Sequence, residues 1–183
     1  YDTGIDSIEA KYASLIEGMD KSLGDIMQYL ENNNQAQNTI IIFISDNGGL
    51  DHHQRGGAVN THNFPLRSGK GSIYEGGIRV PMIVKWPGSP AAGSTHTKPV
   101  IIEDFFPSIL EMARIETTEL RQNTDGSSFV PALQPTGMAK KKEEKRPLIF
   151  HYPHKWINIS PDENLGINYY SALRLDNWKL IYR

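Results

Sequence analysis

The sequence has 183 residues, 38% of them hydrophobic, a length that suits one domain or one domain with a small appendage. Its 19 basic and 21 acidic residues give a formal net charge of −2, which excludes a general nucleic-acid binder because such proteins need a basic surface. There is no cysteine, which excludes a disulfide scaffold and a cysteine nucleophile within these residues, and no apolar run approaches the ~18 residues of a membrane span.

The first predicted element is an amphipathic helix over residues 7–31. Its apolar residues recur at spacings of three and four, which places them on one stripe of a helix. The stripe includes Leu15, Met19, Leu23 and Ile26, and we expect it to pack on a sheet.

Two buried strands are predicted next, over residues 39–45 and 80–85. The first is β-branched and apolar on both faces, a pattern typical of a central strand in a parallel sheet covered by helices. We expect the two strands to lie side by side in one sheet. The intervening residues 50–71 have no usable periodicity, and a stretch of that length usually builds a functional site.

The second half of the chain is predicted to contain a short helix, then a linker, then strands. A short helix over residues 103–112 begins with acidic residues, and a linker over 116–146 ends in a charge run at 140–146 that is typical of a solvated loop. After it the period changes to two, which predicts a strand at 148–152 and a hairpin around Asp176–Asn177. The fold class is therefore α/β, with a small antiparallel subdomain at the end.

Hard oxygen donors follow the first predicted strand. Asp46 offers a carboxylate and Asn47 an amide oxygen, which are ligands suited to Ca²⁺ or Mg²⁺. Ligands of open parallel sheets bind beyond the carboxyl ends of the strands, where these residues stand. An ordinary strand-to-loop turn favours the same residue types, so both interpretations stay open on the pattern alone.

Lys70 lies between Gly69 and Gly71, where flexible backbone amides and a cation would suit an anion. The spacing is not that of a nucleotide-binding phosphate loop, and a mobile surface lysine is the plain alternative. Glu75 and Arg79 are four residues apart, and we expect them to form an ion pair that fixes this loop.

Histidines form the last group of candidates. His62 is the best placed of the loop histidines to face a substrate, whereas His52 and His53 fit a surface loop better. His154 stands in an aromatic segment at 151–156 that could contact a sugar ring or simply pack. No pair of histidines has the helical spacing of a zinc site.

Together, the segments FISDNGG and PLRSGKGSIYEGGIRVPMIVKWPG strongly resemble the second half of a formylglycine-dependent sulfatase, a family of the alkaline-phosphatase-like superfamily. The segments YASLIEGMDKSLGDIMQYLE, EDFFPSILEMARI, TDGSSFVPAL and SALRLDNWKLIYR resemble the family's flanking elements, so the resemblance covers nearly the whole chain. It implies that residues 1–146 are the C-terminal portion of the sulfatase α/β domain, a sheet with flanking helices. Residues 147–183 would then begin a small antiparallel C-terminal subdomain.

The resemblance also assigns expected roles. Asp46 and Asn47 match two metal ligands of the family, usually for Ca²⁺ with Mg²⁺ as the alternative, and Lys70 matches the lysine that contacts the sulfate and the leaving oxygen. His62 and His154 are the expected further substrate-binding residues. The family's nucleophile is a formylglycine made within a C/S-x-P-S-R motif, which this chain lacks. We therefore expect the nucleophile upstream and the isolated chain to be inactive.

The resemblance implies a sulfated carbohydrate or an aryl sulfate as substrate, and a periplasmic or secreted location. Exposed apolar surface is expected to make the isolated chain self-associate. Two alternatives remain open. One is another alkaline-phosphatase-like phosphohydrolase, whose two-metal site is rich in Asp and His and does not match the Lys70 segment. The other is a non-catalytic, calcium-binding pseudo-sulfatase.

Overall fold

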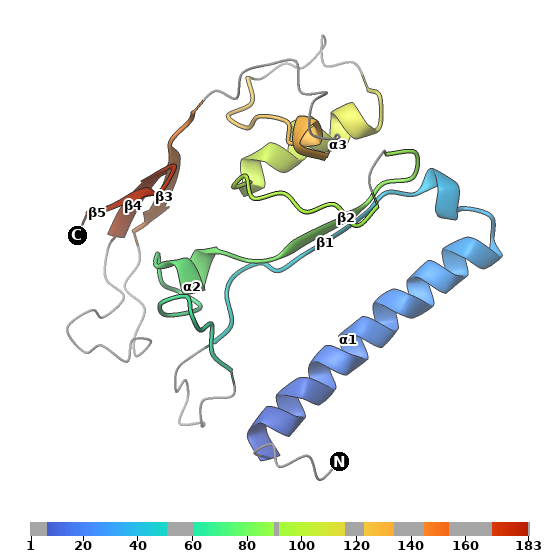
Figure 1. Cartoon of the computed structure of the whole chain (residues 1–183), viewed down its shortest axis with the longest axis horizontal. Coiled ribbons are helices and arrows are strands. Elements are labelled where there is room, and N and C mark those ends of the chain that lie inside the picture. The colour runs from blue at the N-terminus through green and yellow to red at the C-terminus, as the bar shows by residue number, and fades with distance from the viewer. Residues whose placement is uncertain are drawn as a thin grey trace. The chain divides into compact units, whose positions relative to one another are not determined.

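A computed structural model of the chain, shown in Figure 1, describes residues 7–50, 61–89, 92–115, 123–133, 145–153 and 170–182. The chain divides into two compact units. One unit combines Tyr1–Pro87 with Ile149–Arg183, and the other is Gly88–Leu148. A domain boundary near residue 146 stays a prediction. Within the described residues, no helix combines the length and the apolar character that a membrane crossing requires.

Helix α1 (Ser7–Asn32) confirms the first predicted element. Its apolar stripe is not packed on a sheet, however, because Leu15 is 71% exposed and Ile26 is 55% exposed. Among the described elements, α1 contacts only the short 3-10 helix η1 (Ala36–Asn38). The packing prediction is therefore wrong. The physical reason is that the first sheet has two strands of four residues each, too little surface to cover a helix of 26 residues. Self-association of the isolated chain stays a prediction.

The first sheet consists of β1 (Ile41–Ile44) and β2 (Met82–Lys85), which lie side by side as predicted (Figure 1). The two strands run antiparallel, with Ile41 opposite Lys85 and Ile44 opposite Met82. The parallel direction expected from the sequence is therefore wrong for this pair. An apolar pattern reports how much of a strand can be buried, but it carries no information about the direction of the neighbouring strand.

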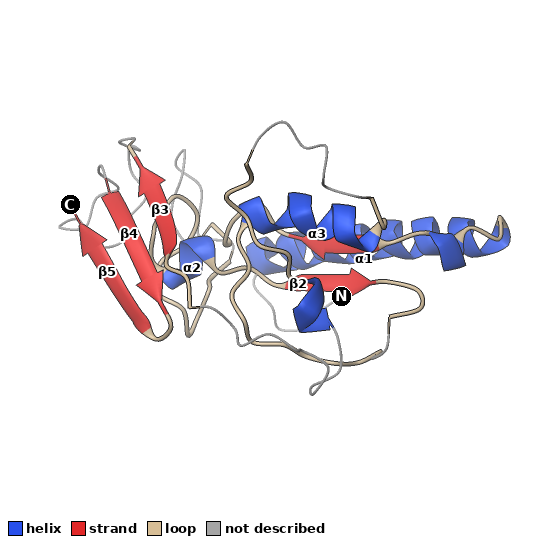
Figure 2. Cartoon of the chain, turned by 90° about the horizontal axis from the view of Figure 1, so that it is seen from above, coloured by secondary structure: helices blue, strands red, loops and turns tan. Residues whose placement is uncertain are grey.

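The second sheet has the order β3-β4-β5 and confirms the period-two pattern near the end of the chain. Its strands are β3 (Leu148–Tyr152), β4 (Tyr170–Leu175) and β5 (Trp178–Tyr182), which Figure 2 shows side by side. The hairpin closes through Asp176, whose φ of +51° belongs to the left-handed region that tight hairpin turns require. One face of this sheet is buried, because Tyr170 and Ala172 pack with Ile73 into a cluster.

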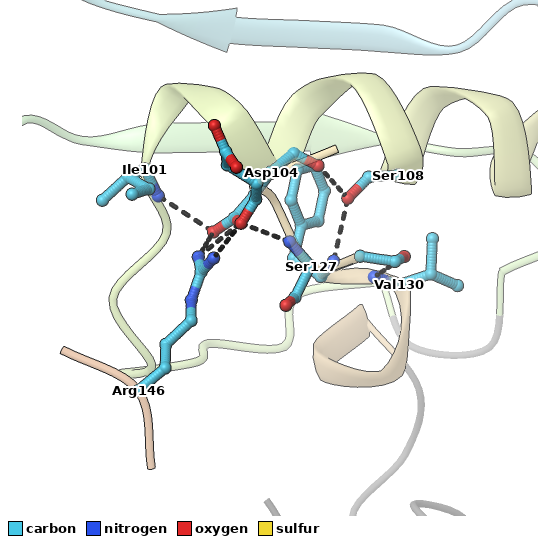
Figure 3. A network of polar contacts seen from close by, with 9 residues as sticks. Ile101, Asp104, Ser108, Ser127, Val130 and Arg146 are labelled. Atoms are coloured by element: carbon cyan, nitrogen blue, oxygen red, sulfur yellow. Dashed lines mark hydrogen bonds and ion pairs between the residues drawn. The ribbon is translucent and has the colours of Figure 1, made fainter. Parts of the chain in front are cut away.

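The unit Gly88–Leu148 is organised around a buried carboxylate, Asp104, which is 3% exposed (Figure 3). It lies at the end of η2 (Ile102–Asp104), immediately before helix α3 (Phe105–Met112), which confirms the predicted helix. The Asp104 carboxylate accepts hydrogen bonds from the backbone N–H groups of Ile101 and Ser127, at 3.1 and 2.8 Å. Arg146 completes the ion pair with both carboxylate oxygens.

Two further features of this unit extend that network. Ser108 donates its hydroxyl to the Asp104 carbonyl at 2.6 Å and accepts from the Phe129 N–H at 2.8 Å, just before the 3-10 helix η3 (Val130–Leu133).

Arg146 belongs to the charge run that was expected to be a solvated loop. Its pairing with Asp104 shows that this expectation is wrong for Arg146, because a buried carboxylate requires a cationic partner. Residues 140–144 of the run lie outside the described residues.

Candidate active site

The turn that follows β1 organises its own polar groups. The Ser45 hydroxyl donates to the Asn47 carbonyl at 2.8 Å, and the Asn47 N–H donates to Asp46 Oδ1 at 3.0 Å. The Asn47 side-chain nitrogen donates to the Gly48 carbonyl at 3.0 Å. With that nitrogen engaged, Asn47 Oδ1 and the exposed carboxylate of Asp46 are the oxygen donors that this turn offers to a ligand.

Glycines let three segments of backbone meet beside this turn. The Gly48 N–H donates to the Gly77 carbonyl at 2.9 Å, and the Gly76 N–H donates to the Arg67 carbonyl at 2.9 Å. A Cβ on Gly48 would lie 1.6 Å from the Gly76 oxygen, and a Cβ on Gly76 would lie 1.8 Å from the Ser68 oxygen. No other residue type fits this approach. Helix α2 (Glu75–Ile78) therefore lies directly against both the 45–49 turn and the loop that precedes Lys70.

Asn63 links the two candidate segments through its side chain. Its Oδ1 accepts from the Gly49 N–H at 2.9 Å, and its Nδ2 donates to the Gly49 carbonyl at 2.9 Å and to the Ser68 carbonyl at 3.1 Å. The Lys70 N–H donates to the same Gly49 carbonyl at 3.0 Å. The structure thus brings the Asp46–Asn47 turn and the Lys70 loop together.

Asn63 itself was missed by the sequence reasoning. The signal that could have found it is its position in a stretch without regular structure. There, backbone groups find their partners in side-chain amides rather than in a helix or a sheet.

Lys70 is half-buried and its backbone is closely constrained. Ser68 and Gly71 on either side have φ values of +64° and +86°, and the Ser72 N–H closes the turn by donating to the Gly69 carbonyl at 3.0 Å. Among the described residues, no carboxylate lies within ion-pair distance of the Lys70 ammonium. A cation without a partner carboxylate in a fixed loop is suited to bind an external anion.

The predicted ion pair between Glu75 and Arg79 is wrong. The Glu75 carboxylate pairs instead with Lys179 at 2.9 Å and with Arg174 at 3.7 Å, both from the β4–β5 hairpin. Helix α2 has a single turn and ends before Arg79, which has an extended backbone (φ −95°, ψ 112°) and an exposed side chain, so the spacing of i and i+4 side chains on a helix does not hold for this pair. Arg79 donates its backbone N–H to the Glu75 carbonyl at 2.8 Å.

The environment of Glu75 has opposing effects on its acidity. Burial raises the pKa of the Glu75 carboxyl, but the hydrogen bond and charge of Lys179, with the charges of Arg174 and Arg79, outweigh burial and lower the pKa below 4.5. Glu75 is therefore ionised at neutral pH and held between two cations.

The remaining candidates divide between described and undescribed residues. His62 is exposed, two residues before the cis peptide bond Phe64–Pro65. His52, His53 and His154 lie outside the described residues. In the part of the chain that the structure describes, no three His, Cys, Asp or Glu side chains gather at a metal-binding distance. Asp46 and Asn47 have the right chemistry for a hard cation, but two residues fall short of the ~6–8 oxygens that Ca²⁺ takes.

Comparison with protein families gives two matches. The family model described as Sulfatase matches residues 2–115. The model described as N-sulphoglucosamine sulphohydrolase, C-terminal, matches residues 68–182.

Individual relatives include proteins that are named as sulfatases. A protein of Formosa agariphila named Sulfatase is 35% identical over 96% of this chain and 32% of its own length. The Steryl-sulfatase of Mus musculus is 31% identical over 82% of this chain and 24% of its own length. The crystal structure of Ps i-CgsB in complex with k-i-k-neocarrahexaose is 30% identical, with a TM-score of 0.70 over 98% of this chain and 35% of that chain. The chain thus spans between about a quarter and a third of the length of the relatives it matches.

Proposed function

The chain belongs to the sulfatase family, and we propose that it forms the C-terminal part of an enzyme that hydrolyses sulfate esters of carbohydrates. The observation that carries the proposal is the shared hydrogen bonding at Gly49. Its carbonyl accepts from both the Lys70 N–H and Asn63 Nδ2, so a cation and a pair of hard oxygen donors belong to one rigid backbone unit. That combination suits an anionic ester, whose charge grows on the leaving oxygen as its bond to sulfur breaks.

Lys70 has the central role in the proposed reaction. Its ammonium contacts the sulfate group and the oxygen that leaves, and this contact strengthens as negative charge develops on that oxygen. An interaction that is stronger in the transition state than in the ground state raises the rate of the chemical step. The constrained backbone around Lys70 supports this role, because a preorganised donor loses little free energy to reorientation during the reaction.

Asp46 and Asn47 would hold Ca²⁺, or Mg²⁺ as the alternative, together with ligands from outside the described residues. When bound, the cation supplies positive charge that offsets the charge of the sulfate oxygens. The proposed nucleophile is a formylglycine upstream of this chain, because the C/S-x-P-S-R motif is not among the 183 residues. His62 and His154 are proposed to contact the remainder of the substrate.

One comparison supports a carbohydrate substrate. The structure in complex with k-i-k-neocarrahexaose is 30% identical and aligns with 98% of this chain. A periplasmic or secreted location is proposed on the family resemblance.

The test is an assay of the complete protein that carries this chain, with 4-nitrophenyl sulfate, 4-nitrophenyl phosphate, a sulfated galactan oligosaccharide and a steroid sulfate. We expect sulfate release from the oligosaccharide to be fastest and phosphate release to be absent. Preferred hydrolysis of the phosphate would identify a phosphohydrolase. No hydrolysis of any ester in a calcium-loaded protein would favour a pseudo-sulfatase.

Substitution of Lys70 tests its assigned role. Lys70→Ala should lower turnover by roughly 10²-fold, the loss expected for one donor to a developing oxyanion, and should leave the melting temperature nearly unchanged. Lys11→Ala, on the exposed surface of α1, is the matched control and should keep full turnover. Near-normal turnover of Lys70→Ala, or a loss that follows unfolding, would contradict the assignment.

A further inference from the structure

The inner face of the β3-β4-β5 sheet contacts the segment that carries Lys70. Arg174 on β4 and Lys179 on β5 are direct cross-strand partners, so their side chains share one face of the sheet. Tyr170 and Ala172 share that face, because alternate residues of a strand point the same way. Both pack against Ile73, which is 4% exposed and lies three residues after Lys70.

Lys179 makes the polar contacts of this interface. Its ammonium donates to the Ile73 carbonyl and to Glu75 Oε1, the second bond at 2.9 Å. Its side chain is only 16% exposed. A single lysine from the hairpin therefore binds a backbone carbonyl and a carboxylate two residues apart in the segment that follows Lys70.

The contacts of Lys179 continue directly into the candidate site. Glu75 is the first residue of α2, and the next residue, Gly76, donates its N–H to the Arg67 carbonyl in the Lys70 loop. Gly77 accepts from the Gly48 N–H in the turn that follows β1. The backbones approach so closely at Gly48 and Gly76 that α2 cannot shift without disturbing both contacts.

We propose that Lys179 is a positioning residue, through which the C-terminal hairpin holds α2 and thereby sets Lys70 relative to the Asp46–Asn47 turn. This inference rests on the proposed function, because it assigns a purpose to the placement of Lys70. The Lys179 ammonium is engaged by the Ile73 carbonyl and by Glu75, so Lys179 acts through α2. Its effect arises because misplacement of a reacting group by about 1 Å can cost up to ~10²-fold in rate.

A purely structural ion pair is the alternative. Loss of such a pair lowers activity only as far as it lowers the folded fraction, and that loss of stability can be large because the Lys179 side chain is little exposed. The positioning role and the purely structural role of Lys179 differ in one measurable respect. A positioning residue acts through Lys70, so its effect on rate should vanish once Lys70 is removed.

The first experiment is a double-mutant cycle in the complete protein, with kcat and KM measured on 4-nitrophenyl sulfate. Lys179→Met keeps the apolar stem and removes the ammonium, and it should lower kcat by about tenfold through misplacement of Lys70, with little change in KM. Lys179→Arg, which keeps a cation that can donate to both acceptors, should restore kcat to within about threefold. In the Lys70→Ala background, Lys179→Met should change kcat by less than about twofold.

Lys21→Met is the matched control, because Lys21 also pairs with a carboxylate, Asp25, but does so on the exposed surface of α1. It should leave kcat unchanged. The positioning role is overturned if Lys179→Met keeps normal kcat, or if it lowers kcat by the same factor with and without Lys70.

A second measurement does not depend on sulfatase activity. In Lys179→Met, amide hydrogen exchange should become about tenfold faster at Gly48 and Gly76, while the amides of α3 should keep their rates. Unchanged exchange at both glycines would overturn the link from the hairpin to the site. If the complete protein hydrolyses no sulfate ester and exchange still accelerates, the proposed function fails and the mechanical link stands. If Lys70→Ala is inactive but Lys179→Met changes neither kcat nor exchange, the positioning role alone fails.

Discussion

Asn63 and Gly49 exchange a reciprocal pair of hydrogen bonds, each 2.9 Å long, across fourteen residues of sequence. The side-chain amide of Asn63 satisfies both backbone groups of Gly49 and also reaches the Ser68 carbonyl. One side chain therefore joins the turn that offers oxygen donors to the loop that carries Lys70. Together with the bond from the Lys70 N–H to the Gly49 carbonyl, this contact sets the relative position of the two candidate segments.

Substitution of Asn63 should lower both stability and activity. Asn63→Ala leaves half-buried backbone groups without partners, at a cost of about 1–3 kcal/mol, and it should lower kcat by at least about tenfold because the two segments separate. Asn63→Asp should be worse, since a carboxylate would then face the carbonyls of Gly49 and Ser68. Chemical denaturation and turnover of the complete protein measure both effects.

Asn33→Ala is the control for this pair of variants, because the Asn33 side chain donates only to the Tyr29 carbonyl on exposed α1. It should keep full turnover. Normal kcat in Asn63→Ala would show that the two segments are held together by other contacts.

The close approach of two backbones at Gly48 predicts that a glycine-to-alanine substitution there has the opposite effect on stability from the same substitution at Gly24. Gly48→Ala places a methyl group on the Gly76 oxygen and should destabilise the protein by about 3 kcal/mol or more, because backbone on both sides must move. Gly24→Ala on α1 meets no atom within 4 Å and should stabilise by about 0.5–1 kcal/mol through helix propensity. Urea denaturation of both variants provides the measurement, and a stable Gly48→Ala variant would refute the close approach.

The ion pair of Glu75 should make stability depend on pH. Because the folded-state pKa lies below 4.5, ionised Glu75 contributes stability that is fully present above pH 4.5. This contribution is lost as the pH falls from 4.5 through the lowered pKa. Glu75→Gln should therefore be less stable than the parent sequence by about 1–3 kcal/mol at pH 7, and the difference should shrink in acid.

The measurement is the free energy of unfolding of both proteins between pH 3 and pH 7. Glu17→Gln on the exposed surface of α1 serves as the control. A difference between Glu75→Gln and the parent sequence that stays constant, or grows, toward low pH would contradict the assignment.

The Asp104–Arg146 pair should be far more sensitive than an exposed pair. Asp104→Ala removes the partner of Arg146 and of two backbone N–H groups, so it should cost about 3–5 kcal/mol. Asp25→Ala breaks the exposed pair with Lys21 and should cost less than about 1 kcal/mol. Thermal denaturation compares the two, and equal losses would show that the Asp104 network contributes nothing beyond a surface ion pair.

The local spacing of apolar residues predicts most of the helices and strands. The spacing of apolar residues in α1, the alternation in β4 and β5, and the turn at Asp176 depend on neighbours within a few residues, so the sequence alone predicts them. The choice of candidate residues also rests on local features, because residue type and neighbouring glycines single out Asp46, Asn47 and Lys70. Their ligands and roles remain proposals.

The tertiary structure alone decided which groups pair. The sequence favoured Arg79 as the partner of Glu75 at a separation of four residues, but the structure places Lys179 there, 104 residues away. It likewise decided the antiparallel direction of β1 and β2, the contacts of Asn63, and the pairing of Arg146 with the buried Asp104. The physical reason is that a polar group pairs with whatever donor the folded chain brings within about 3 Å, and a pattern along the sequence records only local neighbours.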